Sequence, residues 1–191
     1  AHRPNPGALS GVMVRGWDLV TTPRGRPGFY ILSDGTPRIE AAETRGTVVV
    51  GAHSWQVGSL NTPHQGMETE LQIFSPSGGW TLTEGCLVVT LHEGPLRTQG
   101  TWTATVSEVV PAGQARQAGR DELLLTSLGE ATRKALLDVS TGESASIELL
   151  TEPFTAPVVT ALGGGPTLVR DGEIVAGDSP RHPRTAVGYN S

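Results

Sequence analysis

Two arginines and a histidine lie close together near the C-terminal end of the sequence, at Arg181, His182 and Arg184. Guanidinium groups bind phosphate or carboxylate oxygens through paired N–H donors. Three consecutive glycines stand earlier in the same stretch: Gly163, Gly164 and Gly165. Glycines leave a backbone that no side chain crowds, so that a ligand can touch the main chain. These residues together predict an anion-binding site.

The elements around this site must be strands and turns. The glycines end an apolar run, Pro157–Leu162, that predicts a strand. After them, Leu168–Arg170 and Glu173–Ala176 predict two short strands joined by Asp171-Gly172. Asp-Gly tolerates the positive φ values that a type I′ turn requires. The glycine run therefore leads from a strand into a hairpin, and then into the arginine cluster.

The order of these motifs resembles the signature of the phosphodiester glycosidase family. The matching letters are GGGPTLVRDG, and then RTAVG at Arg184–Gly188. Upstream segments match in the same order, at Gly11–Gly35, Leu60-Asn61 and Leu71–Pro76. The resemblance spans nearly the whole chain, which we interpret as one phosphodiester glycosidase-like domain over residues 1–191. It implies a hydrolase that releases a sugar such as N-acetylglucosamine from a sugar-1-phosphodiester.

The resemblance also implies roles for individual residues. Catalytic roles fall on Asp171, Arg184 and Thr185. Substrate binding falls on Gly163, Gly164, Gly165, Asn61 and His182. A phosphate leaving group is already a weak base, with a last pKa of about 6. A cation that stabilises the developing charge therefore helps more than a proton donor, and Arg184 is the residue expected to supply it.

Two of these assignments have a structural alternative. Glycoside hydrolysis needs a carboxylate as nucleophile or base, but an aspartate in an Asp-Gly turn, such as Asp171, is often only a turn residue. Glu70 and Asp178 are weaker candidates for the carboxylate. Asn61 either holds a sugar hydroxyl or caps its own turn, because asparagine commonly bonds to nearby backbone in such loops.

Two family features are missing at the ends. Relatives usually have an Asn-x-x-Phe-Phe strand just before the position of Ala1, and a Val-Asp-Gly-Arg strand soon after that of Ser191. Neither pattern is present. We therefore expect the interior of a domain without its first and last strands, either trimmed, cut, or completed by a companion polypeptide.

Composition narrows the class of protein. A chain of 191 residues is long enough for one domain with a substantial core. The 25 glycines, the 14 prolines and a charged fraction of only 17% favour many short strands and turns. A net charge of −5 argues against a general nucleic-acid surface. No apolar run approaches the roughly 18 residues needed to span a bilayer. We expect a secreted or cell-envelope protein.

Metal, thiol and serine chemistry find no support in the sequence. The histidines, His53, His64, His92 and His182 among them, show neither HxH nor HExxH spacing, so we expect no metal and no cofactor. Cys86 is the single cysteine, within an apolar run, and is expected to be a small buried side chain. No GxSxG motif is present.

The remaining patterns predict an α+β fold, a single domain rich in mixed or antiparallel sheet with few short helices. Gly129–Asp138 has the apolar spacing of a helix. Alternation predicts that the strand Leu71–Pro76 has one buried and one wet face. The continuous β-branched run Thr47–Val50 predicts a strand covered on both faces. Pro23–Pro27 predicts a turn, and Ser33–Thr36 predicts a hairpin loop.

Two other functions fit the same sequence. The first is a noncatalytic module that binds a glycan or phosphoglycan at the cell envelope. The second is a β-rich domain whose glycine run is only a structural bend. Turnover that depends on one carboxylate in the cleft, while binding survives its removal, separates the enzyme from the binding module.

Overall fold

The computed structural model describes residues 12–63, 66–163, 169–170 and 173–174. This part of the chain holds fifteen β-strands, one α-helix and one short 3₁₀ helix. Eleven of the strands form a single sheet. The β-rich fold that the composition predicts is therefore confirmed, with short turns joining most of the strands.

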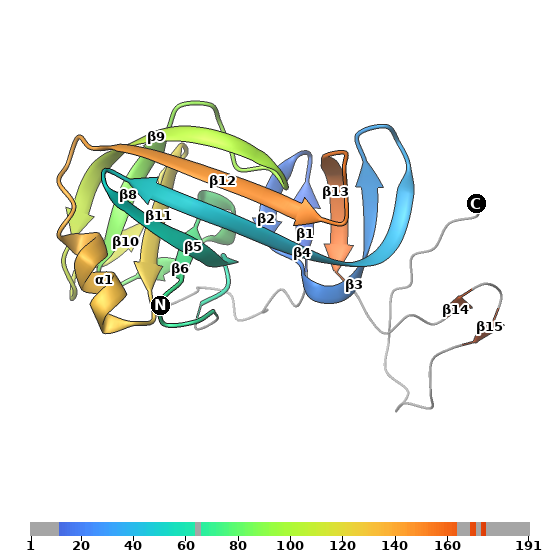
Figure 1. Ribbon diagram of the computed structural model, residues 1–191, viewed down its shortest axis with the longest axis horizontal. Helices are drawn as coiled ribbons and strands as arrows, with labels where there is room; N and C mark the ends of the chain where they lie inside the picture. The colour runs from blue at the N-terminus through green and yellow to red at the C-terminus, as the bar shows by residue number, and fades with distance from the viewer. Residues whose placement is uncertain (1–11, 64–65, 164–168, 171–172, 175–191) are drawn as a thin grey trace.

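Seven strands of this sheet close into a barrel, which the sequence analysis does not predict. Closure occurs because β12 pairs with β9 on one side and with β4 on the other. Neighbouring barrel strands are antiparallel except for the parallel pair β5 and β6. In Figure 1, β4 and β12 cross the molecule side by side. The barrel strands are β4 Pro37–Val50, β5 His53–Leu60, β6 Leu71–Phe74, β11 Glu122–Ser127, β8 Cys86–Leu91, β9 Gly100–Val110 and β12 Ser144–Glu152.

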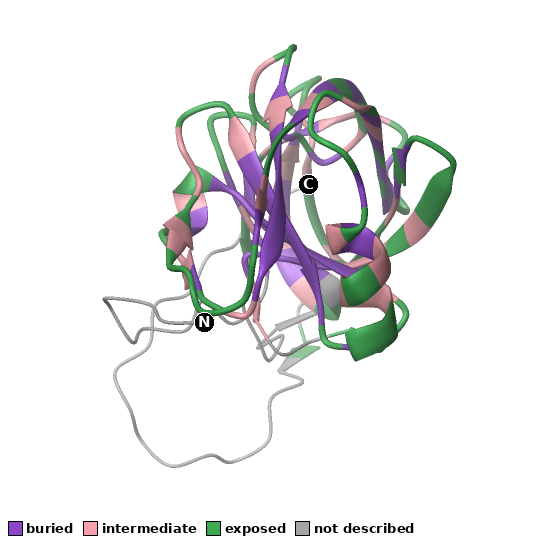
Figure 2. Cartoon of the chain, turned by 90° about the vertical axis from the view of Figure 1, so that its left-hand side faces the viewer, coloured by how far each residue is buried: buried purple, intermediate pink, exposed green. Residues whose placement is uncertain are grey.

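The barrel interior is filled by alternate residues of each strand. Along β12 the alternation is regular, and Ile147 and Leu149 are buried while Glu148 and Leu150 are exposed. The helix α1, Glu130–Leu137, lies against β8 and β11 and adds Leu136 to the same core. Figure 2 shows buried residues gathered inside the barrel and exposed ones around it. The helix confirms the prediction made for Gly129–Asp138.

A second group of strands extends the sheet beyond the barrel. We call this the side sheet. It is built on the first half of β4, which pairs with β3, and then runs through β13, β1 and β2. Its strands are β3 Arg24–Leu32, β13 Val158–Gly163, β1 Met13–Arg15 and β2 Asp18–Thr21. The predicted hairpin loop at Ser33–Thr36 joins β3 to β4, and the Asp34 carboxylate accepts a hydrogen bond from the Thr36 backbone N–H.

Small elements cover the outer face of the barrel at one place. These elements are the 3₁₀ helix Pro76–Gly78 and a two-stranded sheet that follows it in the sequence. The sheet pairs β7, Thr81–Leu82, with β10, Arg116–Gln117. A second apolar cluster fills the space beneath it. Its members are Phe74, Leu82, Cys86, Val88, Val110 and Leu124.

Two predictions of strand burial are wrong. Gln72 and Phe74 are only 3% and 1% exposed, so the predicted wet face of Leu71–Pro76 is wrong. For Phe74 the cause is the outer cluster, which covers a second face that local alternation cannot reveal. The prediction that Thr47–Val50 is covered on both faces is also wrong. Val49 is 37% exposed, so this strand is covered on one face only.

The chain also departs from the prediction at Pro23–Pro27. These residues are not a simple turn, since β3 already begins at Arg24. The register of β3 against β4 shifts between Arg24 and Pro27, where Gly25 has φ 68°. A glycine with positive φ makes such a bulge possible, and the strand continues through it.

The hairpin predicted after the glycine run is confirmed as a pair of strands. β14, Val169–Arg170, pairs in antiparallel register with β15, Glu173–Ile174. Within the described part of the chain, no helix has the length and apolar character needed to cross a membrane.

Cys86 provides a test of the outer cluster. Burial raises the pKa of its thiol from 9.0 to about 12. The folded protein keeps the thiol protonated while the unfolded chain loses the proton, so stability must fall as pH rises from the lower to the higher value. We expect a loss of about 1.4 kcal/mol per pH unit within that window, measured by urea unfolding in alkaline buffers.

The matched variant Cys86→Ala lacks this titration, and its stability should fall less steeply over the same pH range. Iodoacetamide should label wild-type protein only after unfolding. Rapid labelling of the folded protein at neutral pH would contradict a buried Cys86.

Candidate functional site

The predicted glycine run begins at the end of β13, inside the side sheet. Gly163 is the Cα partner of Gly28 on β3, and its backbone N–H donates to the Val12 carbonyl on the other side. Gly28 is in turn the partner of Glu40 on β4. Gly163 is therefore held between two neighbouring strands, which fixes the position of the first glycine of the run.

Tyr30 fills the space above Gly28. A Cβ atom on Gly28 would lie 2.9 Å from the Tyr30 hydroxyl and 2.9 Å from a Val12 methyl carbon. Tyr30 is fully buried, and its hydroxyl has no hydrogen-bond partner among the described residues. Burial, assisted by the charge of Glu40, raises the pKa of Tyr30. The neutral Tyr30 hydroxyl thus lies beside Gly28, the cross-strand partner of Gly163.

Most of the predicted site residues lie outside the described residues. These are Gly164, Gly165, Asp171, His182, Arg184 and Thr185, together with the weaker candidate Asp178. Their proposed contact with a phosphate stays a prediction. Of the predicted set, Gly163 and Asn61 are described: Gly163 ends β13 of the side sheet, and Asn61 follows the end of β5 of the barrel.

Asn61 is a hydrogen-bonding hub between three segments. It is 5% exposed, with φ 51°. Its side-chain N–H groups donate to the Val20 carbonyl and the Ser75 hydroxyl, each at 2.7 Å, and its side-chain oxygen accepts from the Ser75 backbone N–H at 2.8 Å. Its own carbonyl accepts from the Trp80 indole N–H. These bonds favour the alternative that Asn61 holds its turn, and they use both side-chain donors.

Glu70 has a similar local role. Its carboxylate accepts a hydrogen bond from the Met67 backbone N–H at 2.7 Å, which closes the end of the loop before β6. The same carboxylate approaches both Gly58 and Gly66, where an added Cβ would lie 2.6 and 2.9 Å from its oxygen. The geometry of Glu70 is that of a loop clamp, and it gains no support as the catalytic carboxylate.

A cavity opens where β4 and β5 separate. The two strands pair only between Thr47–Val50 and His53–Gln56. Beyond that point β5 runs parallel to β6, while β4 continues into the side sheet. The cavity in this opening has a volume of about 160 Å³, and we call it the fork cavity. It is lined by Thr22, Pro23, Glu43, Thr44 and Gly58.

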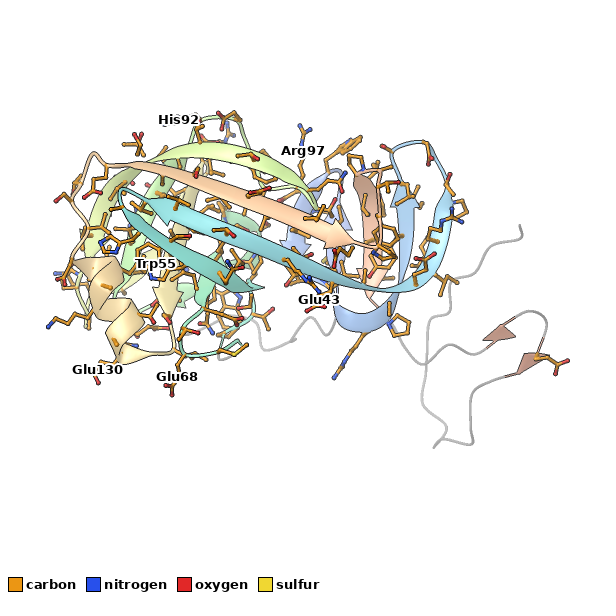
Figure 3. The ribbon with its side chains drawn as sticks, in the orientation of Figure 1. Glu43, Trp55, Glu68, His92, Arg97 and Glu130 are labelled. Carbon is orange, nitrogen blue, oxygen red and sulfur yellow. The ribbon has the colours of Figure 1, made fainter. Side chains whose placement is uncertain are left out.

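β3 connects the region of the fork cavity with the glycine strand end. Glu43 is the partner of Arg24 at the start of β3, and Gly28, further along β3, is the partner of Gly163. Four residues of strand span about 13 Å. Figure 3 shows Glu43 on β4 where that strand passes from the barrel to the side sheet. The cavity draws on three separate segments with no shared motif, so sequence analysis could not find it.

Metal chemistry gains no candidate from the structure. Within the described residues, no group of three or more histidine, cysteine, aspartate or glutamate side chains is placed to hold a metal ion. The exposed His53 stacks on the half-buried Trp55 with ring centroids 5.4 Å apart, and His92 bonds to threonine hydroxyls on β9.

Comparison with known proteins gives one match to a family. A sequence model described as phosphodiester glycosidase matches residues 93–191. This range starts before β9 and includes the glycine run, the Asp-Gly turn and the RTAVG motif. No curated protein matches the chain.

Two solved structures share the fold. A hypothetical protein from Synechocystis has 15% identity and a TM-score of 0.59, covering 87% of this chain and 30% of its own. A structure from Burkholderia pseudomallei K96243, named "Putative exported protein", has 16% identity and a TM-score of 0.50, covering 87% of this chain and 40% of its own. The chain thus spans less than half the length of either protein.

The role of Asn61 can be tested by substitution. We expect Asn61→Ala to lower the free energy of unfolding by about 3 kcal/mol, because it leaves the Ser75 N–H and the Val20 carbonyl without partners. Asn61→Gly should cost about 1 kcal/mol less, since glycine accepts the positive φ without strain. Denaturant unfolding measures both. Unchanged stability in both variants, with a raised KM, would instead favour contact with substrate.

Proposed function

Because this chain belongs to the phosphodiester glycosidase family, we propose that it is a hydrolase that cleaves a sugar-1-phosphodiester, with an N-acetylglucosamine-like sugar as the released group. One observation carries the proposal. The glycine, Asp-Gly and Arg-Thr motifs all fall inside the matched range, and the first glycine of the run stands at the end of a strand held on both sides.

In the proposed reaction, the bond between the anomeric carbon and the phosphate oxygen breaks. The electron pair leaves with the phosphomonoester, and a water oxygen bonds to the carbon, directly or after a covalent intermediate. Arg184 stabilises the charge on the departing phosphate, with His182 and the backbone of Gly163–Gly165 as further contacts. Asp171 serves as the carboxylate that the reaction needs, and it takes the proton of the water. Thr185 lies next to Arg184 and orients the same oxygen atoms.

We also propose that the protein works outside the cytosol. The support is the name of one structural neighbour, which describes that protein as exported. Phosphodiester-linked sugars of the cell envelope are the corresponding class of substrate.

Arg184→Ala tests the hydrolase directly. We expect kcat/KM on p-nitrophenyl-phosphate-linked N-acetylglucosamine to fall about 10²- to 10³-fold, because the variant loses a group that stabilises transition-state charge. Release of free sugar, measured by chromatography, is the readout. Arg120→Ala removes an exposed arginine elsewhere and is the matched control, which should keep full activity.

Asp171→Asn completes this test. It should abolish turnover while sugar-phosphate binding survives, since the amide can neither attack the sugar nor take the proton. Binding without turnover in the wild-type protein would replace the hydrolase with a noncatalytic glycan-binding module. No turnover and no binding would refute both functions.

A further inference from the structure

Residues 111–121 cross the barrel between two strands that are not neighbours, and we call this segment the strap. It joins β9 to β11, and both of these strands pair with β8. The strap leaves after Val110, the partner of Cys86 at the start of β8. It returns at Glu122, the partner of Thr90 near the other end of β8. The strap therefore runs along β8 from one end of that strand toward the other.

Burial along β8 shows which face the strap covers. Leu87 and Val89 belong to the main core inside the barrel, whereas Cys86 and Val88 belong to the outer cluster. All four side chains are fully buried, so β8 is covered on both faces. Ala118 of the strap packs against the outer cluster. The strap thus supplies part of the cover on the outer face of β8.

Little apolar contact holds the strap in place. None of its residues is fully buried, and its apolar side chains are only alanines and one proline. By contrast, β7, with which β10 of the strap pairs, is anchored by Leu82, which is 1% exposed. Segments with few buried apolar contacts open at a lower free-energy cost than the core around them. Polar contacts must therefore keep the strap closed.

Arg116 supplies the strongest of these polar contacts. Its Nε donates to Glu108 on β9 at 2.9 Å, and its Nη2 donates to the two carboxylate oxygens of Glu122 on β11 at 2.9 and 2.8 Å. Because β8 lies between β9 and β11, this guanidinium bridges the two strands that flank β8. Burial raises the pKa of the Cys86 thiol, and the charge of Arg116 opposes that rise, so the guanidinium lies near the thiol.

Backbone groups of the strap add further bonds. The Gly113 N–H donates to the Thr83 carbonyl at 2.7 Å, and the Gly119 N–H donates to the Glu122 carboxylate at 2.7 Å. Glu122 therefore receives bonds from both Arg116 and Gly119. None of these bonds belongs to the ladders of the barrel, so they can break while the barrel strands stay paired.

We propose that the strap is a cover that opens separately from the barrel, with the Arg116 guanidinium as the clasp that keeps it closed. Opening uncovers the outer face of β8, including Cys86 and Val88, while the core inside the barrel stays intact. Access to the outer cluster is then controlled by ionic contacts. The strap belongs to the barrel and Gly163 to the side sheet, so this device does not depend on the proposed hydrolase.

Cys86 reports whether the strap is open. The full chain and its variants are treated with iodoacetamide at neutral pH, and labelling is followed by mass spectrometry. We expect Arg116→Ala to label about tenfold faster than the wild-type protein, because the closed strap loses its charge-assisted hydrogen bonds. Loss of this positive charge alone would slow the reaction by raising the pKa of the thiol, so faster labelling reports opening. Arg120→Ala removes an exposed arginine from the same strap and is the matched control, which should label at the wild-type rate.

Glu108→Gln and Glu122→Gln give a second reading of the clasp. Each removes one carboxylate partner of Arg116, and both should label faster than the wild-type protein. Glu122→Gln should have the larger effect, because its carboxylate also accepts from the Gly119 N–H. These two variants decide the same point should Arg116→Ala fail to fold.

Urea separates opening of the strap from unfolding of the whole chain. Labelling through a local opening changes little at low urea, whereas labelling through global unfolding rises steeply. We expect the shallow dependence in Arg116→Ala. Hydrogen exchange followed by NMR should show the amides of Gly113 and Gly119 exchanging faster than those of Leu87 and Val89 in β8. Labelling of the clasp variants at the wild-type rate, a steep urea dependence, or strap amides as slow as those of β8 would overturn the proposal.

Discussion

The pairing of β4 with β12 is the interaction on which the rest of the structure depends. Eight consecutive pairs join the two strands, from Glu43 with Glu152 to Val50 with Ala145. This ladder closes the barrel and removes its edges, so that buried backbone groups on both strands are satisfied. Because β4 is 14 residues long, it also extends past the barrel and carries β3 and the side sheet. One strand thus fixes the positions of both the core and the glycine strand end.

The fork cavity follows from the same constraint. A strand has two edges, and the first half of β4 gives one of them to β3 while the second half gives it to β5. At the crossover between these partners, β5 must leave, and Gly46 is the residue of β4 at that point. A Cβ on Gly46 would lie 2.6 Å from the Glu148 carbonyl on β12, so the two strands are packed too closely there for a side chain. The opening is a geometric consequence of closing a barrel and extending a sheet with one strand.

Much of the local structure could be predicted from the sequence. The Ser33–Thr36 hairpin, the α1 helix and the pairing around Asp171-Gly172 follow from turn chemistry and apolar spacing, which act over a few residues. The closure between β4 and β12 could not be predicted, since it joins residues about a hundred positions apart and the local pattern of a strand does not identify its distant partner. The burial of Phe74 could not be predicted for the same reason, because it packs in a cluster with Leu82, Cys86 and Val110, which follow it in the sequence.

The two candidate sites also differ in how far the sequence alone can predict them. The glycine and arginine motifs are continuous in sequence, so their family could be recognised from residue order alone. The fork cavity is assembled by Thr22, Glu43 and Gly58 from separate segments, and Thr44 in its wall is hydrogen-bonded to Thr151 on β12. Its chemistry therefore exists only in the folded chain. Since Glu43 belongs to the ladder that closes the barrel and is also paired with Arg24 on β3, the strand that closes the barrel also fixes where the fork cavity lies relative to Gly28, the partner of Gly163.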